Sequence, residues 1–185
     1  MPGLRLWYVA LLGLAGLQRL RELAISRSRA QTIAGRQAAP RSYPYMVALN
    51  VALFLVPPLE VARLRRRPAA PAVWTALVGG AAALRWWCVS TLGSAWNVRA
   101  VVPEDLQPVA SGPYRWVRHP NYLAIAVEFV ALPLAGGAWL SALLLSALNA
   151  LALWRRIEAE ERLLEAVPGY RAAFAGKARF IPGLF

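Results

Sequence analysis

Residues 122–154 read YLAIAVEFVALPLAGGAWLSALLLSALNALALW. This stretch contains two apolar segments, Tyr122–Leu134 and Ala138–Trp154, with the pair Gly136-Gly137 between them. Because so short a link leaves almost no loop, we predict a tight helical hairpin whose outer ends lie on the same side. The polar residues before and after the hairpin would then meet.

Three more apolar stretches precede the hairpin: Leu4–Leu17, Pro44–Leu59 and Ala69–Leu84. A helix that crosses the hydrocarbon core of a bilayer needs about 20 residues, and each of the five stretches is somewhat shorter. Tryptophan and arginine flank the third and fifth stretches, as is typical of a headgroup boundary. We therefore expect five membrane spans, the first a retained span and not a cleaved signal peptide.

The composition supports a membrane protein. Of the 185 residues, 58% are hydrophobic and 16% are charged, and the mean hydropathy is +0.43. Soluble domains have about 45–50% apolar and about 25% charged residues. A soluble helical bundle would lack the polar faces to cover five such stretches. The predicted fold is an all-α integral membrane helical bundle with a small cytosolic C-terminal cap.

The charge is strongly positive, with 21 Lys and Arg against nine Asp and Glu, for a formal net charge of +12. Such an excess raises the question of a nucleic-acid partner. Basic residues placed between apolar stretches fit a membrane surface better, so we expect no nucleic acid. One cysteine, Cys88, and one histidine, His119, leave no ligand set for a metal, and we expect none.

The positive-inside rule gives a conflict. Residues 19–41 contain six arginines and residues 63–67 contain four, yet five simple crossings place these loops on opposite faces. We favour the larger loop as cytoplasmic, which places the C-terminus and the region before the hairpin there, in a bacterial cytoplasmic membrane. The pair Pro57-Pro58 offers an alternative, in which the second stretch is re-entrant.

Residues 111–122, SGPYRWVRHPNY, combine two prolines, two arginines, the single histidine and three aromatic residues just before a span. An interfacial anchor is one interpretation. Residues 155–162, RRIEAEER, continue the fifth span. A solvated face with ion pairs Arg156–Glu160 and Glu158–Arg162 is the structural alternative there.

The hairpin brings these two segments to one interface. A zwitterionic amino-acid group needs a carboxylate for its ammonium and cations for its carboxylate. Here Glu160 and Glu161 would face Arg118 and His119. Nearby aromatic rings could hold an adenine.

The run GPYRWVRHPNYL at 112–123, the hairpin, R-I-x-x-E-E at 156–161, Tyr170 and the ending RFIPG at 179–183 resemble the isoprenylcysteine carboxyl methyltransferase family. The likeness covers residues 85–185, the methyltransferase-like region, and residues 1–84 form the N-terminal transmembrane helices. The resemblance implies S-adenosylmethionine as cofactor and a lipid substrate from the bilayer. The cofactor residues it implies are Tyr114, Arg118, His119, Pro120, Tyr122, Glu160 and Glu161.

RHPNYL, with Trp96-Asn97-Val98-Arg99 upstream, is closest to bacterial members found with type III polyketide synthases, which methylate long-chain phenolic or pyrone lipids. A prenylcysteine-like carboxylate is the other acceptor class. Membrane sterol and steroid reductases, which use NADPH, share the RHPNY-like segment, but the acidic helix after the hairpin suits a sulfonium amino acid better. A non-catalytic membrane protein is a further alternative. No G-x-G-x-x-G turn follows a strand pattern, which excludes a Rossmann methyltransferase.

Methyl transfer to a carboxylate needs no base, whereas a phenol must lose its proton. His119 and Glu128 are candidate bases, and Arg99, Arg115 or Arg118 could stabilise the anion. Glu128 lies mid-span, where an ionisable group is costly and often functional. The structural alternative pairs it with Arg85 or Asn149.

Overall fold

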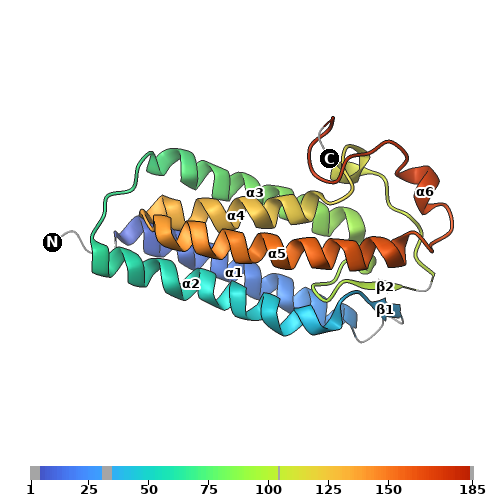
Figure 1. The fold of residues 1–185 in the computed structure, drawn as a ribbon, viewed down its shortest axis with the longest axis horizontal. Coiled ribbons are helices and arrows are strands. Elements are labelled where there is room, and N and C mark those ends of the chain that lie inside the picture. The colour runs from blue at the N-terminus through green and yellow to red at the C-terminus, as the bar shows by residue number, and fades with distance from the viewer. Residues whose placement is uncertain (1–4, 31–34, 104, 184–185) are drawn as a thin grey trace.

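The computed structural model describes residues 5–30, 35–103 and 105–183. The first residue of the predicted Leu4–Leu17 stretch lies outside them. Five long helices run roughly parallel to one axis (Figure 1). In chain order the elements are α1 (Leu6–Ala30), β1 (Gly35–Gln37), α2 (Tyr43–Leu64), α3 (Pro71–Leu92), β2 (Val101–Pro103), α4 (Pro120–Gly136), α5 (Trp139–Leu164) and the short α6 (Tyr170–Ala173). Single 3₁₀ turns occupy Pro40–Ser42, Gly93–Ala95 and Gly112–Arg115.

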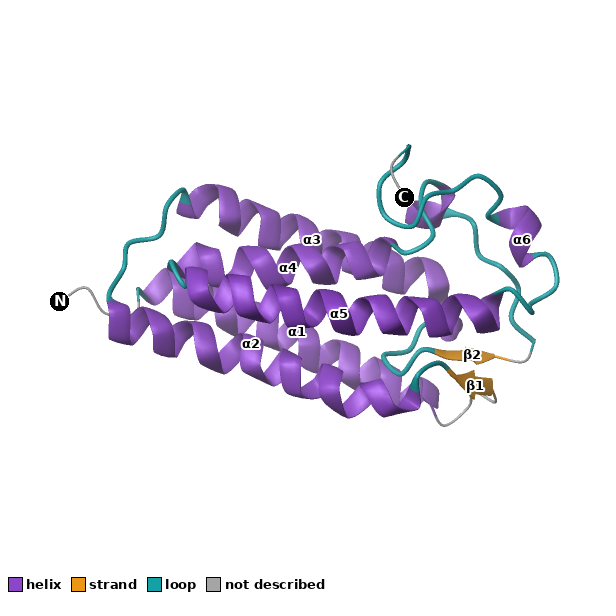
Figure 2. Ribbon diagram, in the orientation of Figure 1, coloured by secondary structure: helices purple, strands orange, loops and turns teal. Residues whose placement is uncertain are grey.

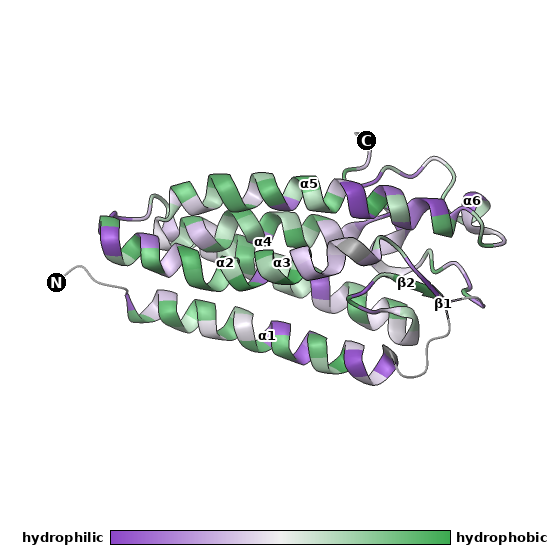
Figure 3. Ribbon diagram, turned by 60° about the horizontal axis from the view of Figure 1, so that its bottom comes forward, coloured by the Kyte–Doolittle hydropathy of each residue, from purple (hydrophilic) through white to green (hydrophobic). Residues whose placement is uncertain are grey.

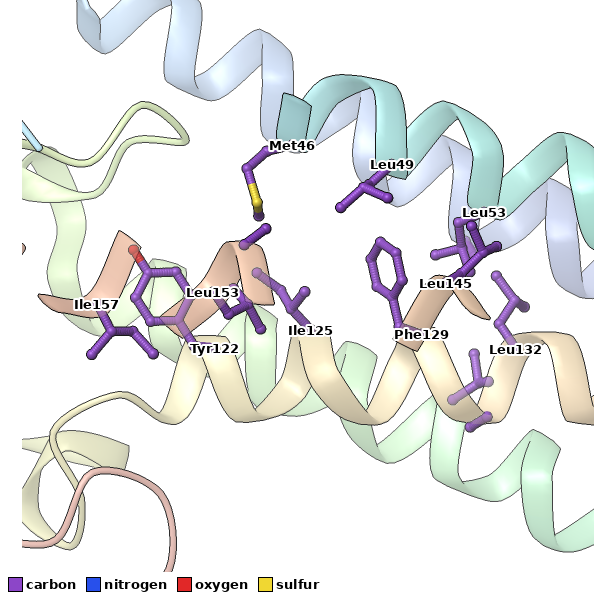
Figure 4. Close-up of a cluster of buried hydrophobic side chains, with 14 residues drawn as sticks. Met46, Leu49, Leu53, Tyr122, Ile125, Phe129, Leu132, Leu145, Leu153 and Ile157 are labelled. Atoms are coloured by element: carbon purple, nitrogen blue, oxygen red, sulfur yellow. The ribbon is translucent and has the colours of Figure 1, made fainter. Parts of the chain in front are cut away.

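Helix α4 is the centre of the bundle. It packs against α3 and α5, and α2 packs against α5 and α4. Helix α1 makes fewer contacts, with α3 and α4, and lies along one side (Figure 3). The buried core between α2, α4 and α5 contains Leu53, Phe129 and Leu132, all fully buried. Tyr122 lies at one end of this core (Figure 4).

The predicted all-α membrane bundle is confirmed. By length and hydropathy three of the described helices can cross a membrane, α2, α3 and α5. Helix α4 is apolar but has only 17 residues, and α1 extends 13 residues beyond the predicted stretch into sequence that carries arginines and a glutamate. Membrane spans at α1 and α4 therefore remain predictions. Both helices depend on neighbouring helices, α1 to cover its polar end and α4 because it is short.

The hairpin between α4 and α5 has the expected tight geometry. Gly137 ends α4 with φ of +90°, a conformation that favours glycine, and its N–H donates to the Leu134 carbonyl at 3.0 Å. The Glu60 carboxylate of α2 accepts hydrogen bonds from the N–H groups of Leu140 and Ser141, at 3.1 and 2.7 Å. A carboxylate at a helix start satisfies free N–H donors and the helix dipole. Glu60 thus fixes the turn of the hairpin.

The re-entrant alternative for the second stretch is wrong. Pro57 and Pro58 lie inside α2, which continues without interruption from Tyr43 to Leu64. A proline removes one helical hydrogen bond and often bends a helix. Pro57 is buried in the bundle, where neighbouring helices support α2 across this point.

The cap gathers at the end of the bundle where α1, α3 and α5 finish (Figure 2). Strands β1 and β2 pair there antiparallel, with Arg36 opposite Val102. The C-terminal segment runs beside the start of α4 and is held there by two main-chain hydrogen bonds. The N–H groups of Arg118 and His119 donate to the carbonyls of Ala178 and Arg179, respectively, each at 2.9 Å. These strand-like pairings were not predicted from the sequence.

Candidate active site

A cavity of about 510 Å³ joins the cap to the bundle interior. Small-molecule sites commonly have volumes of about 300–1,000 Å³. At the cap end the described residues that line it include Tyr114, His119, Tyr122, Glu160 and Tyr170. Deeper in the bundle, its wall is formed mostly by apolar residues of α1 and α2, among them Met46, Val47 and Phe54, and it also contains the ion-paired Arg19, Glu22 and Arg85. One end of the cavity is therefore polar and the other end suits a hydrocarbon chain.

Glu161 is the centre of a cluster of two arginines and a histidine just behind the cavity wall. Its carboxylate accepts hydrogen bonds from Arg179, at 2.6 Å through Nη2, and from His119 Nε2 at 3.1 Å. Arg118 Nη1 lies 3.1 Å from the same carboxylate. The hydrogen bond to Glu161 also raises the pKa of Arg179. Because these three residues come from the start of α4 and from the C-terminal segment, Glu161 ties both to the end of α5.

Glu160, one residue earlier, faces the cavity instead. The Tyr122 hydroxyl donates to the Glu160 carboxylate and accepts a hydrogen bond from Arg156 Nε at 3.0 Å. Arg156 Nη2 donates to the main-chain carbonyl of Val98 at 2.6 Å. The predicted Arg156–Glu160 pair is thus mediated by a tyrosine. The predicted Glu158–Arg162 pair is replaced by a bond from Arg162 Nε to the main-chain carbonyl of Glu158, at 3.1 Å.

The loop before β2 covers the cap end of the cavity. Asn97 binds both the N–H and the carbonyl of Val101, at 2.8 and 2.9 Å, which closes a tight turn. The Val98 N–H donates to the Ser26 hydroxyl of α1 at 3.0 Å. Since Arg156 binds the Val98 carbonyl, this loop connects α1 with α5 across the cavity.

Two tyrosines of the cap stay protonated at neutral pH. Burial raises the pKa of Tyr170 to about 12 and raises the pKa of Tyr114 well above its usual range. Both rings are buried and line the cavity. Their hydroxyl groups can therefore donate hydrogen bonds to a ligand but cannot serve as bases.

The structure brings most of the predicted cofactor residues to one place. Tyr114, Arg118, His119, Tyr122 and Glu160 all line the cavity. The other two support the site from behind: Pro120 is the first residue of α4, and Glu161 binds Arg118, His119 and Arg179.

Of the residues predicted to act in catalysis, His119 and Arg118 line the cavity, whereas Arg99, Arg115 and Glu128 do not. The exposed Arg99 lies over the Tyr43 ring at 5.3 Å, and the exposed Arg115 lies over Trp116 at 3.9 Å. Glu128 is buried, and its expected pairing with Arg85 or Asn149 is wrong, since it accepts a hydrogen bond from Arg19.

The sequence did not reveal the residues that pair with Arg85 and Glu128. Arg85 binds Glu22 of α1, and Arg19 binds both Glu22 and Glu128. A signal was present, because Arg85 directly follows the third apolar stretch, and an arginine that is buried in a membrane bundle requires a partner. The partner lay past the end of the predicted first stretch, where the sequence reads as a polar loop.

This chain is similar to a known protein family and to a known bacterial protein. Residues 74–166, which contain α4, α5 and the RHPNY segment, match the isoprenylcysteine carboxyl methyltransferase (ICMT) family. The uncharacterized protein YpbQ of Bacillus subtilis (strain 168) is 30% identical over 156 residues, which cover 80% of this chain and 91% of that protein. With a family match over half of its length and a cavity under the same residues, the chain belongs to the isoprenylcysteine carboxyl methyltransferase family of membrane methyltransferases.

Proposed function

We propose that this protein is an S-adenosylmethionine-dependent O-methyltransferase that acts on a lipophilic acceptor. The observation that carries the proposal is one continuous cavity that extends from a polar, aromatic end under the cap to apolar residues on α1 and α2. A polar cofactor and a hydrocarbon chain could share such a cavity, each in a matching environment. The family of the chain supports methyl transfer.

The donor set at the cap end fits the cofactor. Glu160 has the Tyr122 hydroxyl as its hydrogen-bond partner, which leaves further lone pairs on its carboxylate for an ammonium group. Arg118, 27% exposed in its side chain, is placed to bind a carboxylate. The rings of Tyr114, Tyr122 and Tyr170 offer faces for a sulfonium and an adenine. The bound cofactor would supply an activated methyl group.

The residues around this site hold the geometry. Glu161 fixes His119 and Arg118 at the start of α4, and Arg156 fixes the Tyr122 hydroxyl. Methyl transfer needs the nucleophile in line with the breaking bond, so positioning provides much of the catalysis. We infer that Glu161 and Pro120 position the site and do not contact the cofactor directly.

The acceptor would enter with its chain among the apolar residues of α1 and α2 and its polar head toward the cap. The acceptor classes that fit are long-chain phenolic or pyrone lipids and prenylcysteine-like carboxylates. We propose a bacterial cytoplasmic membrane with the cap on the cytoplasmic face. The arginines of residues 19–41 favour that orientation, although the four at 63–67 lie at the opposite end.

Calorimetric titration of the purified protein in detergent tests the cofactor. We expect binding of S-adenosylmethionine and S-adenosylhomocysteine and none of NADPH, because the Glu160 carboxylate that lines the cap end suits an ammonium group better than a phosphate. Glu160→Gln keeps the side-chain shape and should weaken binding of S-adenosylhomocysteine by about tenfold or more, the value of one charged hydrogen bond.

The matched control is Glu165→Gln, which changes an exposed glutamate paired with the exposed Arg171. It should bind S-adenosylhomocysteine as the wild type does. Preferential binding of NADPH by the wild type would refute the proposal and favour a reductase. Absence of binding to either cofactor would favour a non-catalytic membrane protein.

A further inference from the structure

Four arginines meet at the end of the bundle opposite the cap, where α1 begins and α2 ends (Figure 1). They are Arg5, which directly precedes α1, and Arg65, Arg66 and Arg67 in the loop after α2. All four are exposed, and together they line a small hollow of about 20 Å³. Two segments that are far apart in the sequence therefore bring their positive charges to one place.

The charge of this arginine cluster is not balanced by the protein. Among the described residues, no carboxylate forms an ion pair with any of the four side chains. Glu60 precedes the loop in α2, but its two oxygens accept hydrogen bonds from the start of α5. Arg66 lies over the Trp139 ring at 5.0 Å, a contact that leaves its charge in place. The hollow therefore has a net positive charge that an anion could balance.

Helix dipoles explain the arginines after α2 but not Arg5. The end of a helix favours cations, which suits the loop after α2. Arg5 instead precedes the first turn of α1, where the dipole is positive and the first N–H groups need acceptors. That turn contains no acidic residue, whereas the first N–H groups of α5 bind Glu60. An anion in the hollow would be attracted both by the start of α1 and by the arginine cluster.

The size and surroundings of the hollow indicate a lipid phosphate as the anion. A volume of about 20 Å³ admits one oxygen-sized group, since a single water needs about 10–15 Å³, and the rest of the ligand must lie outside. Trp7, which also lines the hollow, is 37% exposed, and its neighbour Leu6 is 88% exposed. Arginine and tryptophan at the end of apolar helices are typical of the headgroup level of a bilayer. A lipid there could extend its chains along the exposed apolar residues of α1.

We propose that the arginine cluster binds the phosphate of an anionic phospholipid, with one phosphate oxygen in the hollow. Arginine suits this ligand, because a guanidinium can bind two phosphate oxygens through paired N–H donors. The inference is independent of the proposed function. It also gives the arginines of residues 63–67 a role on either face of the membrane, so their number is explained without placing this end in the cytoplasm.

Lipid binding can be measured by native mass spectrometry and by thermal unfolding of the purified protein. The detergent micelles contain equal mole fractions of phosphatidylglycerol or phosphatidylcholine with the same acyl chains. Inorganic phosphate and glycerol 3-phosphate are the soluble probes. The triple variant Arg65→Gln/Arg66→Gln/Arg67→Gln removes most of the cluster, and Arg65→Lys/Arg66→Lys/Arg67→Lys keeps its charge but loses the paired donors. Arg5→Gln changes the cluster from the other segment.

We expect the wild type to bind phosphatidylglycerol in preference to phosphatidylcholine and to have a higher Tm in its presence. Each arginine near an anionic lipid contributes about fivefold to binding, or about 1 kcal/mol. Arg5→Gln should therefore weaken phosphatidylglycerol binding about fivefold, and the triple glutamine variant about tenfold or more. The lysine variant should recover part of the loss. The matched control, which removes the same charge from exposed arginines in the cap half of the bundle, should bind like the wild type; it is Arg21→Gln/Arg27→Gln/Arg155→Gln.

Three results would overturn the inference. The first is an equal loss of phosphatidylglycerol binding in the control, which would show a diffuse attraction between a basic protein and anionic lipid. The second is equal stabilisation of the wild type by inorganic phosphate or glycerol 3-phosphate, which would show that the ligand is soluble. The third is wild-type binding by Arg5→Gln, which decides the question alone if the triple glutamine variant does not fold. Titration with S-adenosylhomocysteine tests the proposed function separately.

Discussion

Replacing Glu161 by glutamine should loosen the cap and leave the membrane helices in place. The carboxylate of Glu161 contacts Arg118, His119 and Arg179, and it is 8% exposed. Glutamine keeps the shape of the side chain but removes the negative charge. Two arginines would then remain near a buried neutral amide, with no other carboxylate contact of theirs recorded among the described residues.

The size of the effect follows from the burial of the partners. Removing one member of a buried ion pair costs about 3–5 kcal/mol. The side chains of Arg118 and Arg179 keep 27% and 23% of their exposure, so water compensates part of this loss. We therefore expect a loss of about 2–4 kcal/mol. For a chain of this size, that corresponds to a fall in Tm of about 4–16 °C.

Two measurements in detergent detect this loss of stability: thermal unfolding by circular dichroism, and limited digestion with trypsin. Trypsin cleaves after Lys177 and Arg179, in the segment that the Glu161 cluster holds against the start of α4. Cleavage there should accelerate before the helices unfold, and Glu165→Gln should show neither change. An unaltered Tm and digestion rate, together with lost S-adenosylhomocysteine binding, would show that Glu161 contacts the cofactor directly and that our positioning role is wrong.

Three further changes probe other parts of the structure. Gly136→Ala should cost about 1–3 kcal/mol by thermal unfolding, because the added Cβ would lie 2.4 Å from Cζ of the buried Tyr8; a smaller loss in a Tyr8→Leu background would confirm that contact as the cause. Tyr122→Phe removes the hydroxyl between Arg156 and Glu160 and should weaken S-adenosylhomocysteine binding about three- to tenfold; it should also cost about 1–3 kcal/mol by thermal unfolding, because the buried Arg156 loses an acceptor, and unchanged calorimetric affinity would contradict the binding role. At equal mole fraction in liposomes, kcat/KM should rise with acceptor chain length, since each buried CH₂ contributes about 0.8 kcal/mol; equal rates for short phenols would mean that the acceptor site opens to water.

The hairpin and the cap site could be predicted because their signals are local. Gly136-Gly137 allows only a tight turn, and the two polar segments at its outer ends must then meet. His119 and Glu161 are 42 positions apart, yet their contact follows from the hairpin alone. The distinction between Glu160 and Glu161 could not be predicted, because it depends on the rotation of α5 and on where Arg179 lies.

The buried ion pairs of α1 and the two strands could not be predicted from the sequence, for a different reason. The pairs Arg85–Glu22 and Arg19–Glu128 join residues 63 and 109 positions apart, and an ion pair carries no pattern along the chain. The three-residue strands β1 and β2 show no clear alternation of polar and apolar residues. They form because the ends of α1 and α3 place two short segments side by side, which is a property of the whole bundle.

If α4 spans the membrane as predicted, the unequal lengths of α4 and α5 would place the site at the membrane boundary. Both helices start or end at the Gly137 turn, but α4 has 17 residues and α5 has 26, which correspond to about 26 Å and about 39 Å. Helix α4 alone is close to the roughly 30 Å thickness of the hydrocarbon core. The last turns of α5 therefore extend past the start of α4, and these turns carry Glu160 and Glu161, whereas Arg156 lies level with that start. A cofactor bound to them would lie in the headgroup region, while the cavity below continues beside α4 toward Arg19 and Arg85. Under the proposed function, the length difference within one hairpin would set a polar cofactor above an acceptor that remains in the bilayer.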